Sequence, residues 1–218
     1  MEIKSSRCSG FNHREFVLSF DEEIPKVDVD WLLTKLENSV ANGSVFEDGQ
    51  SIEFGPMLLR VELLDGFLHL MEPDFQNIPI EWKPGVSSSL RLLRLQKDVG
   101  ESFLSSDQLD YCSPRQSCIV GIDVQSGDHS FVLERVESNG SESGWFFGLV
   151  ASVHDYSAPD NLRRMSIYEA LLTVPRIGAF LAMPPGASIR ESESETIFSI
   201  ADEELVPVEG SLLHRARS

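Results

Sequence analysis

Basic residues are scarce in this sequence. It has 18 lysines and arginines against 35 aspartates and glutamates, which gives a formal net charge of −17, and it has no lysine after Lys97. A surface that binds nucleic acid needs a basic patch or stripe, and anionic membranes attract polybasic segments. The composition therefore argues against both nucleic acid and membrane as partners.

Long apolar runs and a cysteine framework are also missing. No run approaches the roughly 18 apolar residues of a membrane span, and the first residues lack the apolar segment of a secretory signal. We therefore expect a cytoplasmic protein. Three cysteines, Cys8, Cys112 and Cys118, are an odd number without the spacing of a zinc site, which predicts free thiols.

Motifs of catalysis are absent as well. The sequence contains neither a G-x-S-x-G nucleophile elbow nor a glycine-rich phosphate loop. The five histidines are scattered, and His154-Asp155 are neighbours in the chain rather than a spaced pair. We therefore expect no catalytic residue, no metal and no cofactor, and we interpret the protein as a non-enzyme.

The composition is otherwise that of a globular protein, with 218 residues of which 41% are hydrophobic. This length suits one large domain or two small ones. The polar, turn-rich segment 105–117 divides two patterned halves and is the best candidate for a linker. We predict two α+β domains at 1–110 and 111–218, each a mainly antiparallel sheet with one or two helices.

Periodicity places elements within both halves. In the first half it predicts a strand at 15–20, helices at 30–40 and 87–104, and a hairpin turning at Asp65-Gly66. Trp31 is expected to be a core or staple residue. In the second half it predicts a helix at 166–174 and strands at 118–124, 131–136, 144–150, 179–183 and 196–200. The acidic C-terminus is expected to be loose.

Acidic runs are the candidate partner-binding residues. They comprise Asp21, Glu22 and Glu23, and Glu191, Glu193 and Glu195, with a further run at 202–204. The alternating spacing from Glu191 to Glu195 would place three carboxylates on one face of an extended strand. An acidic patch can steer a basic protein partner, whereas a plain solvated surface is the simpler alternative.

Five segments of the second half carry a further signal by their order and spacing. They read C-I-V-G-I-D-V (118–124), S-G-W-F-F (143–147), S-A-P-D-N (157–161), M-S-I-Y-E-A-L-L-T-V-P-R-I (165–177) and P-P-G-A-S-I (184–189). Together, over about 117–200, they resemble the bacterial domain called immunity protein thirty-three-like. The residues that carry the resemblance are Gly144, Trp145, Phe146, Phe147, Asp160, Asn161 and Tyr168. We expect Trp145, Phe146, Phe147 and Tyr168 to be core residues.

The resemblance implies an interaction protein that binds and neutralises a cognate protein toxin. We expect that toxin to be basic, because an acidic protein would be steered toward a basic active site. The sequence departs from the family pattern after the aromatic pair, where Gly148-Leu149-Val150 replace the usual acidic residues. Residues 1–110 show no such resemblance. Two alternatives remain open: a regulatory or scaffold domain that binds another protein or a small ligand, and an enzyme with an unrecognised carboxylate site.

Overall fold

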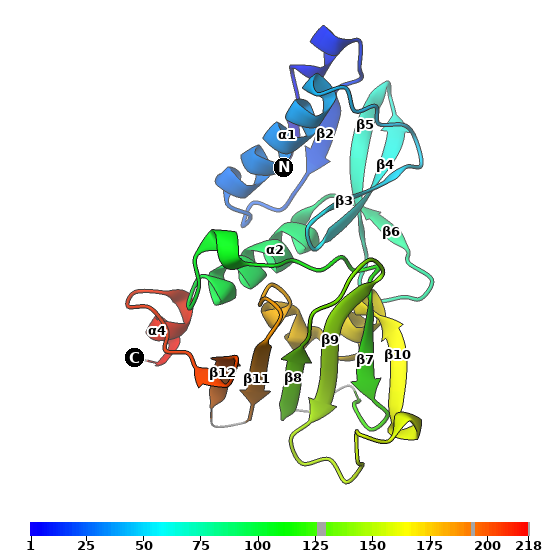
Figure 1. Cartoon of the computed structure of the whole chain (residues 1–218). Coiled ribbons are helices and arrows are strands. Elements are labelled where there is room, and N and C mark those ends of the chain that lie inside the picture. Colours follow the sequence, from blue (N-terminus) through cyan, green and yellow to red (C-terminus); the bar gives the residue numbers. More distant parts are fainter. Residues whose placement is uncertain (126–129, 193–194, 218) are drawn as a thin grey trace. The chain divides into compact units, whose positions relative to one another are not determined.

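The computed structural model describes residues 1–125, 130–192 and 195–217 (Figure 1). The chain divides by its internal contacts into two compact units, Met1–Arg94 and Leu95–Ser218. This division lies earlier than the predicted boundary at residue 110, and the extent of independently folding domains stays a prediction. Both units combine a sheet with helices, so the predicted α+β class is confirmed.

The first unit is built on a six-stranded sheet. Strand order is β1-β2-β5-β4-β3, and β6 pairs with β5. Every neighbouring pair is antiparallel except β2 and β5. The strands are β1 (Glu2–Lys4), β2 (Phe16–Ser19), β3 (Ser51–Phe54), β4 (Met57–Leu64), β5 (Phe67–Pro73) and β6 (Trp82–Pro84). A short helix η1 (Cys8–Phe11) follows β1, and α2 (Ser87–Gly100) begins in this unit.

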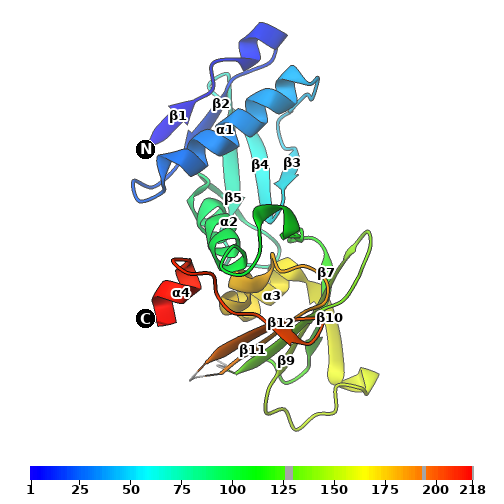
Figure 2. The same cartoon turned by 60° about the vertical axis from the view of Figure 1, so that its left-hand side comes forward.

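Helix α1 (Lys26–Ala41) packs along this sheet and forms the core of the unit (Figure 2). Its buried apolar residues, Val29, Leu32, Leu36 and Val40, recur every three or four positions and so share one face of the helix. The predicted helix is confirmed and is longer than expected. Trp31 is not a core residue, because its position lies off this face and leaves it 39% exposed.

The predicted hairpin at Asp65-Gly66 is confirmed. The two residues join β4 and β5, whose register pairs Leu64 with Phe67. Both have positive φ, 50° at Asp65 and 84° at Gly66, as the tight two-residue turn requires.

The second unit contains a seven-stranded sheet in the order β10-β7-β9-β8-β11-β12-β13. Only β7 and β9 run parallel among its described pairs. Its strands are β7 (Ser117–Gly121), β8 (Phe131–Arg135), β9 (Glu142–Leu149), β10 (Leu162–Ser166), β11 (Ala187–Glu191), β12 (Thr196–Ile200) and β13 (Glu203–Glu204). Its helices are η2 (Ser106–Gln108), η3 (Pro159–Asn161), α3 (Ile167–Thr173), η4 (Pro175–Phe180) and α4 (Leu212–Arg217).

Helices α3 and η4 cover one face of this sheet (Figure 2). Helix α3 begins with a capping box in which Ser166 and Glu169 bond each other's backbone N–H groups. The predicted strand at 179–183 was wrong. This apolar stretch belongs to η4 and the turn after it, and it is buried without entering the sheet. Strands β10 and β11 were not predicted.

Cys8, Cys112 and Cys118 are all buried and free, which confirms the predicted thiols. Burial raises the pKa of Cys112 to about 11, although Arg135 nearby favours the thiolate. Burial also raises the pKa of Cys118 to about 12. Because the thiolate is the reactive form, these cysteines are chemically quiet in the folded protein.

Glu15 stabilises the N-terminal segment of the first unit. Its carboxylate accepts hydrogen bonds from the Ser5 hydroxyl and from the backbone N–H groups of Cys8 and Ser9. Burial works to raise its pKa, but these hydrogen bonds outweigh burial and hold the pKa of Glu15 at about 2, against an ordinary value of 4.5. The ionised form is therefore favoured by folding.

We predict that Glu15 makes the protein sensitive to acid. A carboxyl whose pKa is lowered by folding stabilises the protein above its unfolded pKa, and this contribution disappears as the pH falls from about 4.5 toward 2. Urea denaturation at neutral pH should show Glu15→Gln to be less stable by roughly 1–2 kcal/mol. The difference should close at pH 2, and an equal difference at both pH values would contradict the assignment.

Candidate functional site

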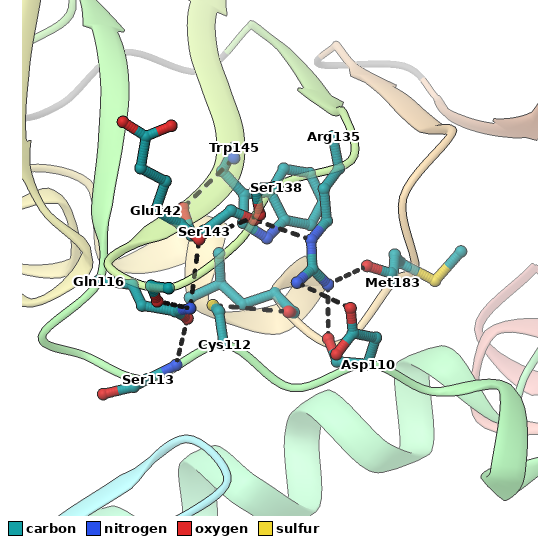
Figure 3. Close-up of polar contacts among 12 residues, drawn as sticks. Asp110, Cys112, Ser113, Gln116, Arg135, Ser138, Glu142, Ser143, Trp145 and Met183 are labelled. Carbon is teal, nitrogen blue, oxygen red and sulfur yellow. Dashed lines mark hydrogen bonds and ion pairs between the residues drawn. The ribbon is translucent and has the colours of Figure 1, made fainter.

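A buried arginine organises the second unit. The guanidinium of Arg135, on β8, donates hydrogen bonds to the backbone carbonyls of Asp110 (2.5 Å), Ser143 (3.1 Å) and Met183 (2.7 Å). It also pairs with the Asp110 carboxylate at 3.1 Å, although its side chain is only 4% exposed. Figure 3 shows these contacts converging on one guanidinium. Arg135 thus ties the segment before β7 and the turn before β11 to strands β8 and β9.

The S-G-W motif forms an irregularity in β9 next to Arg135. The three residues of β7 from Ser117 to Ile119 lie opposite the five residues of β9 from Glu142 to Phe146, so β9 holds two extra residues there. Gly144 lies in this bulge with φ of +76°, and a Cβ there would be 2.1 Å from the Val136 carbonyl oxygen. Only glycine tolerates both the positive φ and the close approach of the Val136 carbonyl. The backbone of the bulge therefore explains why the motif has glycine at this position.

The bulge decides which motif side chains face the core. Trp145 and Phe147 are buried against the helix-covered face, each 1% exposed, so the expectation for both is confirmed. Phe146 alternates to the opposite face and is half-buried. The expectation that Phe146 is a core residue was therefore wrong, because neighbouring residues of a strand point to opposite sides of the sheet.

The opposite face of the sheet is called the open face here. One row across it consists of residues in register on four neighbouring strands: Arg164 on β10, Ile119 on β7, Phe146 on β9 and Glu134 on β8. Ile119 is 36% exposed and Val136, which follows β8, is 64% exposed. The row and its neighbours line a hollow of about 240 Å³. An apolar floor with charged margins is typical of a protein-binding surface.

Tyr156 closes the other end of the open face. Its ring lies so close over Gly121 and Gly148 that an added Cβ would be 2.5 Å and 2.6 Å from ring carbons. Its hydroxyl donates to Asp123 Oδ1 (2.7 Å) and accepts from the Leu149 N–H (3.0 Å). This packing explains the departure from the family pattern at Gly148, since a larger residue would displace the ring.

Asp123 anchors the loop that carries Tyr156. Burial opposes ionisation, but hydrogen bonds from Ser152 and Tyr156 hold the pKa of Asp123 below its usual value. Burial raises the pKa of Tyr156, and the Asp123 carboxylate adds to that effect. These hydrogen bonds hold the loop that carries Tyr156 in place. In that loop the side chain of Val153 is 93% exposed, and the nearby Ile122 and Val150 are exposed as well. Ile122 and Asp123 belong to the quoted segment 118–124, but no motif marked Tyr156 as their neighbour.

One family model matches the part of the chain that carries the open face. Residues 95–199 match the Imm33-like domain. The resemblance deduced from the sequence motifs is confirmed, and the match begins earlier in the chain than those motifs do. No curated protein and no solved structure gives a significant match. Immunity-like families are generally non-enzymatic.

The remaining motif residues, Tyr168, Asn161 and Asp160, lie in α3 and in η3. Tyr168 is 3% exposed within α3, which confirms it as a core residue. The side-chain amide of Asn161 donates to the Asp155 backbone carbonyl, and the backbone carbonyl of Asn161 accepts from the Ile122 N–H. Asp160 is exposed in the first turn of η3. The P-D-N segment thus connects the Tyr156 loop to the end of β7.

Glu191 and Glu195, the two described members of the C-terminal acidic run, do not lie on one strand. Glu191 ends β11 and Glu195 precedes β12, while Glu193 lies outside the described residues. Glu191 is 7% exposed and pairs with Arg176 at 2.6 Å, whereas Glu195 is exposed and borders a second hollow together with Glu204. Glu191 and Glu195 therefore do not share the predicted strand face, because β11 and β12 pair antiparallel with Glu191 opposite Thr196.

The N-terminal acidic run is exposed at all three positions. Asp21 and Glu23 form ion pairs with Arg91, at 2.7 Å and 3.5 Å. Glu22 is the one carboxylate of this run, which lies wholly within the described residues, that forms no ion pair. A role of either run in partner binding stays a prediction.

The described residues contain neither a metal-ligand cluster nor a membrane-spanning helix. Across 1–125, 130–192 and 195–217, no three histidine, cysteine, aspartate or glutamate side chains gather in a way that could hold a metal ion. No helix within these ranges is long and apolar enough to span a bilayer.

We predict that replacing Arg135 strongly destabilises the second unit. Arg135→Met should lower the free energy of unfolding by about 3–5 kcal/mol, because it leaves buried carbonyls and the Asp110 carboxylate without their partner. Arg164→Met is the control, since Arg164 and Glu142 form an exposed pair and such pairs contribute about 1 kcal/mol or less. Chemical denaturation of both variants gives the comparison, and equal losses would refute the central role of Arg135.

A second prediction concerns the glycines under Tyr156. Gly148→Ala should displace the ring and cost about 1–3 kcal/mol by overpacking, with changed NMR signals for Tyr156 and Asp123. Gly10→Ala is the matched control because its Cβ would meet nothing within 4 Å. If the two alanine variants are equally stable and the Tyr156 signals are unchanged, the ring does not depend on the glycines.

Proposed function

We propose that this protein is a bacterial immunity-type protein that binds a cognate protein toxin stoichiometrically and neutralises it in the cytoplasm. The observation that carries the proposal is the match of residues 95–199 to the Imm33-like domain. The protein would act by occupying the toxin rather than by turning over a substrate. Toxin and inhibitor would meet through the Imm33-like domain.

The open face supports a binding role. It presents Ile119, Phe146 and Val136 to solvent beside the charged residues Glu134 and Arg164. The two ends of the face are fixed, one by the bulge at Gly144 and the other by Tyr156. A preorganised surface loses little conformational entropy on binding, which favours affinity.

The charge of the chain supports a basic toxin. A net charge of −17 steers basic partners toward the protein and raises the association rate more than the affinity. Asp21, Glu22, Glu23 and Glu195 are exposed and can contribute to this steering. Glu191 is better explained as a buried partner of Arg176.

We predict that the protein forms a one-to-one complex with the toxin encoded beside it. Co-expression should abolish toxicity, and the two proteins should co-purify and elute together in size-exclusion chromatography. Association should slow at least tenfold as salt rises from low to high concentration, while dissociation changes less. Absence of a complex, or catalytic turnover of nucleic acid, peptide or glycan by the purified protein, would contradict the proposal.

Charge-reversal variants separate the two acidic runs. One carries Asp21→Lys, Glu22→Lys and Glu23→Lys, and the other carries Glu193→Lys and Glu195→Lys. Glu191 is left intact because its reversal would test folding rather than binding. We expect the C-terminal variant to slow association more, because that run lies in the half that contains the Imm33-like domain. Unchanged rates in both variants and in salt would show that steering by these runs is absent.

A further inference from the structure

We propose that the hollow on the open face is the anchor site for one arginine side chain of the partner protein. The inference rests on the proposed function and specifies where and how the partner is held. The hollow is formed within the second unit by β7, β8, β9 and β10, with Ile119, Phe146, Val136, Glu134, Glu142 and Arg164 among its lining residues.

The size of the hollow suits a side chain. Its volume of about 240 Å³ lies below the roughly 300–1,000 Å³ of sites that enclose small molecules. Protein interfaces instead place single large side chains, often arginine, tyrosine or tryptophan, into hollows of this kind. A side chain projecting from a partner surface is therefore the occupant that fits.

The charge of the hollow selects a cation. Arg164 is already engaged, because its guanidinium donates to Ser117 Oγ (2.8 Å and 3.0 Å) and pairs with Glu142 at 2.8 Å. Glu134 is exposed and has no ion-pair partner within the described part of the chain. The uncompensated charge at the hollow is therefore one carboxylate, which a cationic group would neutralise.

The floor of the hollow favours arginine over lysine. In the register of the sheet Glu134 lies directly across from Phe146, which is followed by Ile119 on the next strand. A carboxylate beside an aromatic ring matches a planar guanidinium, which can bond the carboxylate with two N–H groups while it stacks on the ring. The aliphatic part of the same side chain would cover Ile119 and Val136.

The test uses an arginine peptide as the probe and needs no toxin. Acetyl-Gly-Arg-Gly-amide is titrated into the full-length protein while NMR follows the methyl groups of Ile119 and Val136 and the ring of Phe146. We expect saturable shifts at these three residues, with a dissociation constant on the order of millimolar, as suits a single side chain. The peptide with citrulline in place of arginine keeps the shape without the charge and should bind at least fivefold more weakly.

Glu134→Gln and Glu137→Gln form a matched pair of variants. Both remove one exposed carboxylate, but only Glu134 lines the hollow. Glu134→Gln should weaken arginine-peptide binding at least fivefold, and Glu137→Gln should leave it within twofold of the unchanged protein. The assignment would be overturned if the two variants had equal effects or if the NMR shifts lay outside the hollow. It would also be overturned if the citrulline peptide, or a peptide with lysine in place of arginine, bound as tightly as the arginine peptide.

The outcome is independent of the toxin experiment. If the toxin complex forms and Glu134→Gln binds the toxin as well as Glu137→Gln does, the anchor site is refuted while the immunity function stands. If the arginine peptide binds at the hollow but no toxin complex forms, the anchor chemistry stands and the immunity function is refuted.

Discussion

The structure of the second unit depends on the buried charge of Arg135. A guanidinium that is withdrawn from water must find hydrogen-bond acceptors, because leaving it unpaired costs several kcal/mol. Arg135 finds them in three separate segments, at Asp110, Ser143 and Met183. The hydrogen bonds that satisfy the guanidinium therefore also hold the segment before β7, the bulge of β9 and the turn before β11 in place relative to one another.

This fixed frame separates the two faces of the sheet. Trp145 and Phe147 fill the helix-covered side, while Phe146 lies on the open face with Ile119 and Glu134. The Gly144 bulge and the Tyr156 ring over Gly121 and Gly148 then shape that face at its two ends. A surface formed on strands and supported by packing is more rigid than one formed on free loops, and such rigidity lowers the entropic cost of binding.

Charge and shape would act at different stages of recognition. The net charge of −17 acts over about a Debye length, ~8 Å at physiological salt, and affects encounter. The open face has a small apolar floor and one uncompensated carboxylate at Glu134, which act only at contact. The overall negative charge would thus raise the rate of association with a basic partner, and the hollow would fix how the two surfaces align.

The sequence by itself determined the α+β class, the helix α1, the Asp65-Gly66 hairpin, the free thiols and the match to the Imm33-like domain, because these follow from local periodicity, turn chemistry and motif order. Tertiary structure decided the rest. Trp31 is exposed, since burial depends on what packs nearby and not on hydrophobicity alone. The apolar stretch 179–183 is buried, but in η4 and the turn after it and not in a strand. The pairing of strands far apart in sequence brings Arg164, Ile119, Phe146 and Glu134 into one row. No local pattern encodes that long-range register, and so the open face could be found only in the folded chain.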